Sequence, residues 1–238
     1  MTPTARFVFD HVSVVAPQGW RLRDATGAVP RDGVCAIVGP SGSGKSTLLR
    51  LCNRLEVPVH GVVELDGVDL STLDPLSLRR RVGMVFQRPT PFAGTGRDNL
   101  RVADPEIDNA TATQLLARVR LDASFLDRDA LQLSGGEAQR LCLARSLAAH
   151  PEVLLMDEVT SSVDGATRVA LEELAVTCAR VGTTVLWVTH DLQQAQRVAQ
   201  HVIVVIDGRI AHAAAVDAVV HDAPPEVVRF FEEDFDAE

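Results

Sequence analysis

Apolar and polar positions alternate along the first part of the chain. The alternation runs from Phe7 to Val15, and a second strand-like stretch lies between Pro17-Gln18-Gly19 and Arg31-Asp32-Gly33. Two further apolar runs flank the Asp66-Gly67 turn between residues 62 and 70, which is typical of a hairpin. Because a period of two indicates strands with one buried face, we predict an antiparallel β layer from these segments.

Later in the chain, short apolar runs alternate with segments of helical periodicity. Strands are predicted over residues 34–38, 82–86, 153–156, 184–188 and 201–206. Helices are predicted from near Lys45 to residue 55, over residues 76–81, 137–149 and 166–180, and after Asp191. From Leu171, apolar residues recur at i, i+3, i+4 and i+7, which predicts a helix with one face packed on a sheet. Strands that alternate with helices predict a largely parallel α/β sheet.

Residues 88–149 interrupt this alternation. Prolines and glycines open a loop, and residues 113–121 carry helical periodicity. We therefore predict a single composite domain over residues 1–238, in which residues 1–87 and 150–238 form the core with its β layer and residues 88–149 form a helical insertion.

Composition limits the classes of function. Of 238 residues, 46% are hydrophobic and 23% are charged, which is ordinary for a soluble globular protein. The formal net charge of -9 argues against a nucleic-acid partner, which clustered Lys and Arg would hold. The N-terminus lacks the apolar stretch of a signal peptide, and no apolar run approaches the ~20 residues that span a bilayer. We therefore expect a cytosolic protein. Separately, the acidic segment 232–238 predicts a solvated or frayed end of the chain.

One glycine-rich stretch matches the phosphate-binding loop at every fixed position. It consists of Gly39, Pro40, Ser41, Gly42, Ser43, Gly44, Lys45, Ser46 and Thr47, and it lies between a predicted strand and a predicted helix. The glycines let backbone N–H groups turn inward on phosphates. Lys45 is expected to reach the β- and γ-phosphates, and the Ser46 hydroxyl to bind Mg²⁺. A nucleoside triphosphate is therefore the predicted ligand; a plain glycine-rich turn is the alternative.

A second motif is the apolar run 153–156, which ends in two carboxylates. Asp157 is expected to bind Mg²⁺, directly or through water, beside the phosphate-binding loop. Glu158 could act as the general base that polarises the attacking water. The alternative is a strand that ends in surface acids.

A third motif, residues 133–137, precedes a helix. Ser134 and Glu137 have the spacing of a capping box, which is a sufficient structural explanation. Gly135 and Gly136, however, leave backbone N–H groups accessible to an anion.

Further motifs complete a set with a fixed order: residues 39–47, Gln87 after a strand, residues 133–140, residues 153–158, residues 161–164 and Thr189-His190-Asp191. This set resembles an ABC transporter ATP-binding subunit over nearly the whole chain. The resemblance implies a P-loop NTPase (RecA-like) α/β core with an N-terminal antiparallel β layer and an inserted helical subdomain. It also implies an ATPase that uses ATP and Mg²⁺ and is coupled to transport.

The resemblance implies that two cassettes close head to tail. Ser134, Gly135, Gly136 and Glu137 of one copy would then face the γ-phosphate held by Lys45 of the other. It further implies that Gln87 contacts the metal and the attacking water, that Asp164 lines the dimer seam and that His190 touches the γ-phosphate. The implied partners are a second ATP-binding subunit, transmembrane permease subunits and, for an importer, a substrate-binding protein. The chain would lie on the inner face of the cell membrane.

Three positions depart from the family pattern. The aromatic residue that stacks on adenine is absent near Val15-Ala16, Glu137 stands where Gln is usual, and Gly96 replaces a branched apolar residue. We predict that Trp20 supplies the adenine contact, with packing in the β layer as the alternative. We also predict that the Glu137 carboxylate folds back on the N–H of Ser134. No catalytic group is lost, so an active ATPase is expected.

The transported substrate is less well defined by the sequence. Residues 79–92 are similar to phosphate-importer ATPases, whereas export-type cassettes share residues 49–55 nearly as well. A soluble ABC-type ATPase outside transport is a further alternative, although such proteins usually carry two cassettes or a long coiled-coil insertion. Substrate choice belongs to other subunits, so this chain carries no pocket for it.

Overall fold

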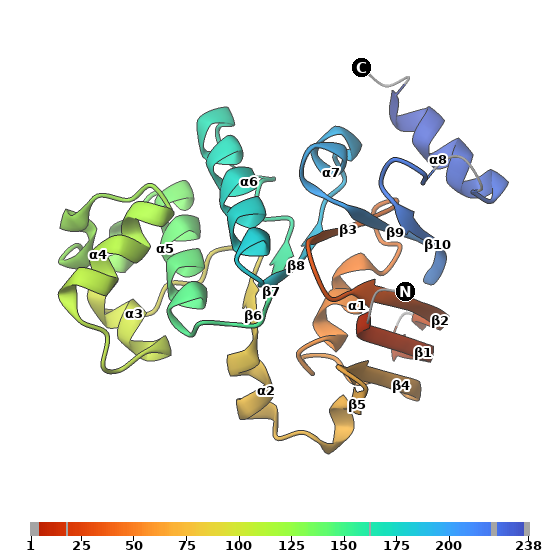
Figure 1. Ribbon diagram of the computed structural model, residues 1–238, viewed down its shortest axis with the longest axis horizontal. Helices are drawn as coiled ribbons and strands as arrows, with labels where there is room; N and C mark the ends of the chain where they lie inside the picture. The colour runs from red at the N-terminus through yellow and green to blue at the C-terminus, as the bar shows by residue number, and fades with distance from the viewer. Residues whose placement is uncertain (1–4, 18, 162, 220–222, 236–238) are drawn as a thin grey trace.

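Two β sheets form the centre of the computed structural model, which describes residues 5–17, 19–161, 163–219 and 223–235 (Figure 1). The first sheet has the order β2-β1-β4-β5, and its pairs are antiparallel. Its strands are β1 (Ala5–Ala16), β2 (Gly19–Pro30), β4 (His60–Leu65) and β5 (Val68–Asp69). The predicted β layer and its hairpin are therefore confirmed.

The second sheet has six strands in the order β10-β9-β3-β8-β7-β6. It is parallel except for β10, which runs antiparallel to β9. Its strands are β3 (Val34–Val38), β6 (Val82–Val85), β7 (Val153–Asp157), β8 (Thr184–Val188), β9 (His201–Ile206) and β10 (Arg209–Ala215). The carboxyl ends of β3, β6, β7 and β8 therefore meet at one edge, where ligands of parallel sheets bind.

Helix α1 (Lys45–Leu51) lies between the two sheets. Leu48 and Leu49 are fully buried in one cluster with Phe7 and Phe9 of the β layer and with Leu186 of the parallel sheet. The neighbouring Trp187 points to the opposite face of β8, where it is fully buried in a second cluster, as expected for a core strand. The start of α1, and with it the phosphate-binding loop, is thus held from both sides.

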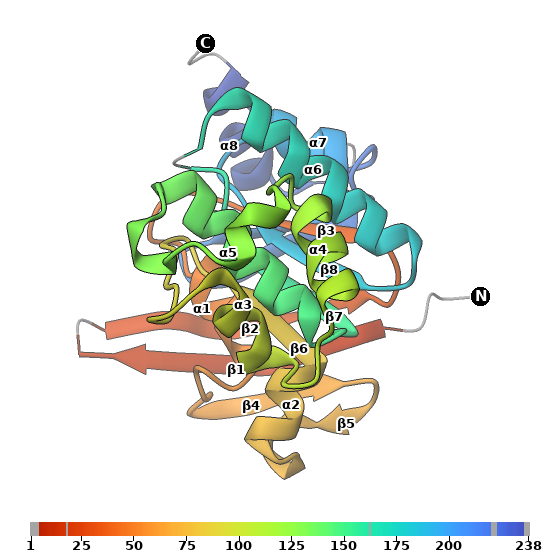
Figure 2. The ribbon, with the colours of Figure 1, turned by 90° about the vertical axis from the view of Figure 1, so that its left-hand side faces the viewer.

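Of the remaining helices, α2 (Pro75–Arg81) packs through Leu78 into the same cluster as α1, and the others cover the other face of the parallel sheet and one end of the molecule. These others are α3 (Gly96–Ala103), α4 (Asn109–Arg118), α5 (Gly135–Ala148), α6 (Gly165–Arg180), α7 (Leu192–Val198) and α8 (Pro225–Phe235). Short 3-10 turns lie at Leu70–Thr72, Ala123–Leu126 and Ala130–Gln132. Helices α3, α4 and α5 lie together on the left in Figure 1, away from the β layer, and they face the viewer in Figure 2. Residues 88–149 are thus mostly helical, as predicted.

Gly96 has a structural reason for its departure from the family pattern. It is the first residue of α3, and a Cβ at this position would lie 2.1 Å from the Phe125 carbonyl oxygen. The backbone of the Ala123–Leu126 turn therefore occupies the space that a side chain would need.

The acidic end corrects one prediction. Residues 232–235 belong to helix α8 rather than to a frayed terminus, because Val227 and Phe231 are buried in the core one helical turn apart. Glu232 is exposed, and residues 236–238 lie outside the described residues.

Candidate active site

The loop between β3 and α1 has a backbone that only glycine can follow at two points. Gly39 has a φ of 145°, and a Cβ there would lie 2.0 Å from the Val205 carbonyl oxygen. Gly44 has a φ of 107°, and a Cβ there would lie 2.6 Å from the carbonyl oxygen of Arg21. Gly42 faces open space instead. The loop is thus packed against β9 and β2 on its inner side and remains accessible on its outer side.

Lys45 is the buried cation of this loop. Its side chain is 6% exposed, and Nζ donates hydrogen bonds to the carbonyl oxygens of Gly39 and Pro40, both at 2.8 Å. Burial lowers the pKa of Lys45, whereas Glu158 and then Asp157 act in the opposite direction. The ammonium group therefore lies beside two carboxylates with only neutral oxygens as hydrogen-bond partners.

A pocket of about 360 Å³ opens over the loop, and we call it the loop pocket. The residues that line it are Arg21, Ser41, Gly42, Gly44, Lys45, Ser46, Thr47, Arg50 and Glu158. Polar groups dominate this lining, with three cationic side chains and one carboxylate. Six of the nine predicted loop residues thus share a pocket with two arginines that the sequence interpretation did not single out, whereas Gly39, Pro40 and Ser43 do not line it.

Ser46 and Asp157 come together at the edge of this pocket. The Ser46 hydroxyl donates to Oδ1 of Asp157 at 2.7 Å, and Arg50 approaches Oδ2 at 3.3 Å. A hydroxyl and a carboxylate are hard oxygen ligands, so the pair fits Mg²⁺. Within the part of the chain that the structure describes, no group of three or more His, Cys, Asp or Glu could hold a metal ion. An ion at this point would therefore depend on oxygens of a nucleotide and of water.

Glu158 follows Asp157 in a left-handed backbone conformation. Its φ is 47°, a conformation that costs energy in residues other than glycine. Its N–H donates to the Val188 carbonyl oxygen at 3.1 Å, which ties the residue to β8. The Glu158 side chain is thereby turned toward the pocket rather than continuing the strand.

Gln87 and His190 meet at the carboxylate of Glu158. Nε2 of Gln87 donates to Oε2 of Glu158 at 3.0 Å, and Nδ1 of His190 lies 4.0 Å from the same oxygen. The three residues follow β6, β7 and β8, whose carboxyl ends are adjacent in the sheet. A carboxylate in this position is suited to accept a proton from water.

The predicted capping box at Ser134 is present, and both halves are formed. Oε2 of Glu137 accepts hydrogen bonds from the Ser134 N–H at 2.8 Å and from the Ser134 hydroxyl at 2.7 Å. These hydrogen bonds, and then the nearby Arg128, hold the pKa of Glu137 below its usual value. The folded-back position of Glu137 is therefore confirmed. A Cβ at Gly135 or Gly136 would meet nothing within 4 Å, so this helix start is open to solvent.

The remaining predicted site residues, Asp164 and Trp20, do not line the loop pocket. Asp164 is the N-cap of α6 and accepts hydrogen bonds from the backbone and the hydroxyl of Thr167. Trp20 is 52% exposed on β2, and it is not one of the described residues that line the loop pocket, whereas the adjacent Arg21 is. No local pattern singles out Arg21, because its position depends on how the β layer packs against the loop. Arg50, in contrast, could have been found from its spacing, because it lies four residues after Ser46 on one face of α1.

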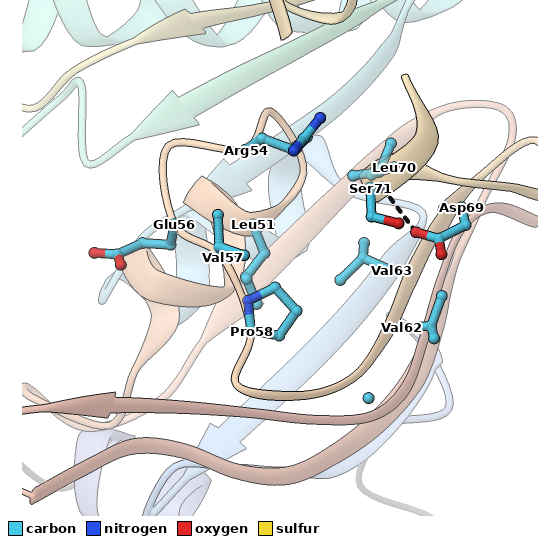
Figure 3. Close-up of a pocket in the computed structure, with 11 residues that line it drawn as sticks. Leu51, Arg54, Glu56, Val57, Pro58, Val62, Val63, Asp69, Leu70 and Ser71 are labelled. Atoms are coloured by element: carbon cyan, nitrogen blue, oxygen red, sulfur yellow. Dashed lines mark hydrogen bonds between the residues drawn. The ribbon is translucent and has the colours of Figure 1, made fainter. Parts of the chain in front are cut away.

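A second cavity, of about 150 Å³, lies between the end of α1 and the β layer (Figure 3). Its lining includes the apolar residues Leu51, Val57 and Leu70, and it contains none of the predicted site residues. Figure 3 shows the carboxylate of Glu56 pointing away from the other labelled residues. This carboxylate instead lies 3.4 Å from Nη1 of Arg21.

The parallel sheet, the glycine loop and the carboxylates at β7 define a P-loop nucleoside triphosphatase. Residues 22–161 match the family described as ABC transporter, and the chain belongs to this family. It is 41% identical over 224 residues to "ABC transporter I family member 17" of Arabidopsis thaliana, covering 92% of this chain and 85% of that protein. It is 39% identical to "Phosphate import ATP-binding protein PstB 1" of Vibrio cholerae, covering 88% and 83%.

Solved structures agree with this assignment. An Atm1-family ABC exporter with ATP bound superposes with a TM-score of 0.84 at 27% identity, covering 95% of this chain and 41% of that chain. The dimeric ATP-binding cassette MJ0796, in a post-hydrolysis state with ADP and Pi, gives 0.79 at 27% identity, covering 88% and 98%. The chain is therefore an ABC ATPase domain with the predicted P-loop fold. Among the described residues, no helix is long and apolar enough to cross a membrane.

Proposed function

We propose that two copies of this chain bind ATP and Mg²⁺ between them and hydrolyse the ATP to drive transport through a separate permease. The observation that carries the proposal is the convergence at one pocket of Lys45, the Ser46–Asp157 pair and the Gln87–Glu158 pair. These groups come from three parts of the chain that are distant in the sequence, namely the start of α1 and the ends of β6 and β7. Their chemistry covers phosphate binding, metal binding and activation of water.

Residues in and beside the loop pocket have separate roles in hydrolysis. Lys45 leaves the carbonyl oxygens of Gly39 and Pro40 to bind the β- and γ-phosphates, because charged oxygens are stronger acceptors. Ser46 and Asp157 hold Mg²⁺, which supplies positive charge to the phosphates when bound. Glu158 accepts the proton of the attacking water, and Gln87 orients the Glu158 carboxylate.

The second copy completes the site. Ser134 and the glycines after it lie at an open helix start and do not line the loop pocket of their own chain. We place them against the γ-phosphate held by the partner copy, with Asp164 at the seam and His190 at the γ-phosphate. The dimeric state of the related MJ0796 cassette supports this arrangement.

The permease partner is proposed to bind near Gln87. Phe86 and Phe92 flank this residue and are 37% and 50% exposed, next to the helices of residues 88–149. Residues 88–149 would then act as the helical subdomain that transmits closure to the permease. In this arrangement the chain lies on the cytoplasmic face of the membrane.

For the transported substrate, we propose phosphate import. Support comes from residues 79–92 and from the similarity to the Vibrio cholerae phosphate-import protein. An importer would add a substrate-binding protein to the assembly. Export is the second candidate, because the ATP-bound Atm1-family exporter has a similar fold.

Isolation of the tagged chain from its native membranes tests the proposal. An intact complex should contain a permease, and the complex reconstituted in vesicles should couple Mg²⁺-dependent ATP hydrolysis to phosphate uptake. A permease that expels substrate would favour the export alternative. Recovery of ribosomes in place of any membrane protein would overturn the transport proposal.

A further inference from the structure

The β layer brings one arginine into the loop pocket. Arg21 lies on β2, between the half-exposed Trp20 and the fully buried Leu22. Its carbonyl oxygen is so close to the loop that a Cβ at Gly44 would lie 2.6 Å from it. Arg23, two residues later, donates its N–H to the Gly208 carbonyl oxygen at 2.8 Å. The backbone of Arg21 is thus fixed against the start of α1, and its side chain can reach a ligand in the loop pocket.

The guanidinium of Arg21 has a partner that a ligand can replace at small cost. Nη1 lies 3.4 Å from Oε1 of Glu56, and the two side chains are 46% and 29% exposed. Ion pairs between solvated side chains contribute little to stability, because water screens the charges and holding two long side chains costs entropy. By contrast, Arg50 pairs with the buried Asp157, beside the proposed metal ligands.

The two ends of the loop pocket differ in chemistry. Lys45, Ser46 and Glu158 mark the end where the phosphates and the metal belong. Arg21 comes from the other sheet, and its guanidinium pairs with Glu56, which does not line the loop pocket, so we assign Arg21 to the opposite wall. Among the described residues, none of those that line the pocket is aromatic. Of the two guanidinium groups in the described lining, that of Arg50 pairs with Asp157, so that of Arg21 is the one available to a nucleobase.

We propose that Arg21 stacks its guanidinium on the adenine ring of bound nucleotide and replaces the aromatic residue that is missing near Val15-Ala16. The inference rests on the proposed nucleotide site at residues 39–47. A guanidinium is planar, delocalised and weakly hydrated, so it binds the face of an aromatic ring. Stacking of this kind is tolerant of the base, because every base has a π-face.

Calorimetric titration of the full chain with ADP and with inorganic pyrophosphate tests the proposal, because neither ligand is hydrolysed. Arg21→Ala should weaken ADP binding about fivefold or more and leave pyrophosphate binding within about twofold. Arg21→Phe should restore ADP binding, whereas Arg21→Lys, which keeps the charge without the plane, should not. Arg23→Ala removes an exposed arginine from the same strand and should behave as the parent protein.

Three outcomes would overturn the proposal. Unchanged ADP binding by Arg21→Ala would mean that Arg21 makes no contact. An equal loss for ADP and pyrophosphate, restored by Lys, would make Arg21 a phosphate ligand. A loss in Trp20→Ala without one in Arg21→Ala would place the base on Trp20. Lys45→Ala tests the nucleotide site separately, since it should weaken both ligands whichever residue holds the base.

Discussion

The carboxylate of Glu137 occupies both hydrogen-bond donors of Ser134 in the isolated chain. These donors are the ones that we assign to the γ-phosphate of the partner copy. The carboxylate is thus an internal anion at the position proposed for an external one. Arg128, at 3.4 Å, offsets part of its charge, and the Arg128 guanidinium is itself held over the Phe125 ring at 4.2 Å.

Glu137→Gln tests the balance between capping and repulsion. We expect little change in ATPase rate and a loss of about 1 kcal/mol in the free energy of unfolding at neutral pH, because an amide is a weaker cap. The folded-state pKa of Glu137 lies below its unfolded value, so its contribution is present above the unfolded pKa and is lost as pH falls through the folded pKa. Denaturant titrations should therefore show a difference in unfolding free energy between the parent protein and the variant at neutral pH, and this difference should disappear at acid pH. A large rise in ATPase rate would show that the charge had inhibited hydrolysis.

Glu158→Gln tests the general base. The amide keeps the shape of the side chain and its place beside Gln87 but cannot accept a proton, so hydrolysis should fall by about 10²–10⁴-fold. Nucleotide affinity should stay within a few-fold, because Lys45 and the loop are unchanged. Phosphate release and equilibrium titration with ATP measure the two quantities. Hydrolysis near the parent rate would assign the base to another group.

At the scale of elements, the local sequence determines how the site is built. The caps of α5 and α6 come from Ser134 and Asp164, and each accepts hydrogen bonds from the first turn of its own helix. The left-handed Glu158 follows directly after β7, and the constrained Gly39 follows directly after β3. Catalytic groups therefore stand at the ends of rigid strands, where the backbone fixes their direction.

Whether a helix, strand or contact could be predicted from the sequence depends on whether its signal is local. Strands with two buried faces, such as Val153–Asp157, and the glycine loop are local signals, so their positions followed from periodicity and spacing. Helix α8 was missed because the acidic run Glu232-Glu233-Asp234 was interpreted as a solvated or frayed end, although Val227 and Phe231 have helical spacing. The contact of Arg21 with the loop is set by how one sheet packs on the other, and no local pattern reports it.

Gly96→Ala should destabilise the helical end of the molecule. The added Cβ would lie 2.1 Å from the Phe125 carbonyl oxygen, so backbone must move, at a cost of about 1–3 kcal/mol. Gly165→Ala is the matched control, since Gly165 also opens a helix and a Cβ there meets nothing within 4 Å. Thermal unfolding compares the two variants. Equal melting temperatures would show that the Ala123–Leu126 turn adjusts freely.

At the scale of the whole molecule, each layer contributes one part of the proposed site. The parallel sheet presents Asp157 and Glu158, the β layer presents Arg21, and α1 between them carries Lys45. The start of α5 lies outside this pocket and is open. Within one copy, the proposed nucleotide site therefore lacks the Ser134 group. The start of α5 in the same copy could bind an anion but lies away from that copy's own nucleotide site.

Mixing two inactive variants tests whether the site is shared between copies. Lys45→Ala removes phosphate binding from its own loop, and Ser134→Ala removes a donor that we assign to the partner's site. In a mixed dimer, the intact Lys45 of one copy faces the intact Ser134 of the other, so one complete site forms and the second site carries both defects. Phosphate release should therefore rise above that of either variant alone when the two are mixed. If each site were built within one chain, every copy would keep its own defect, and mixing would leave the summed rate unchanged.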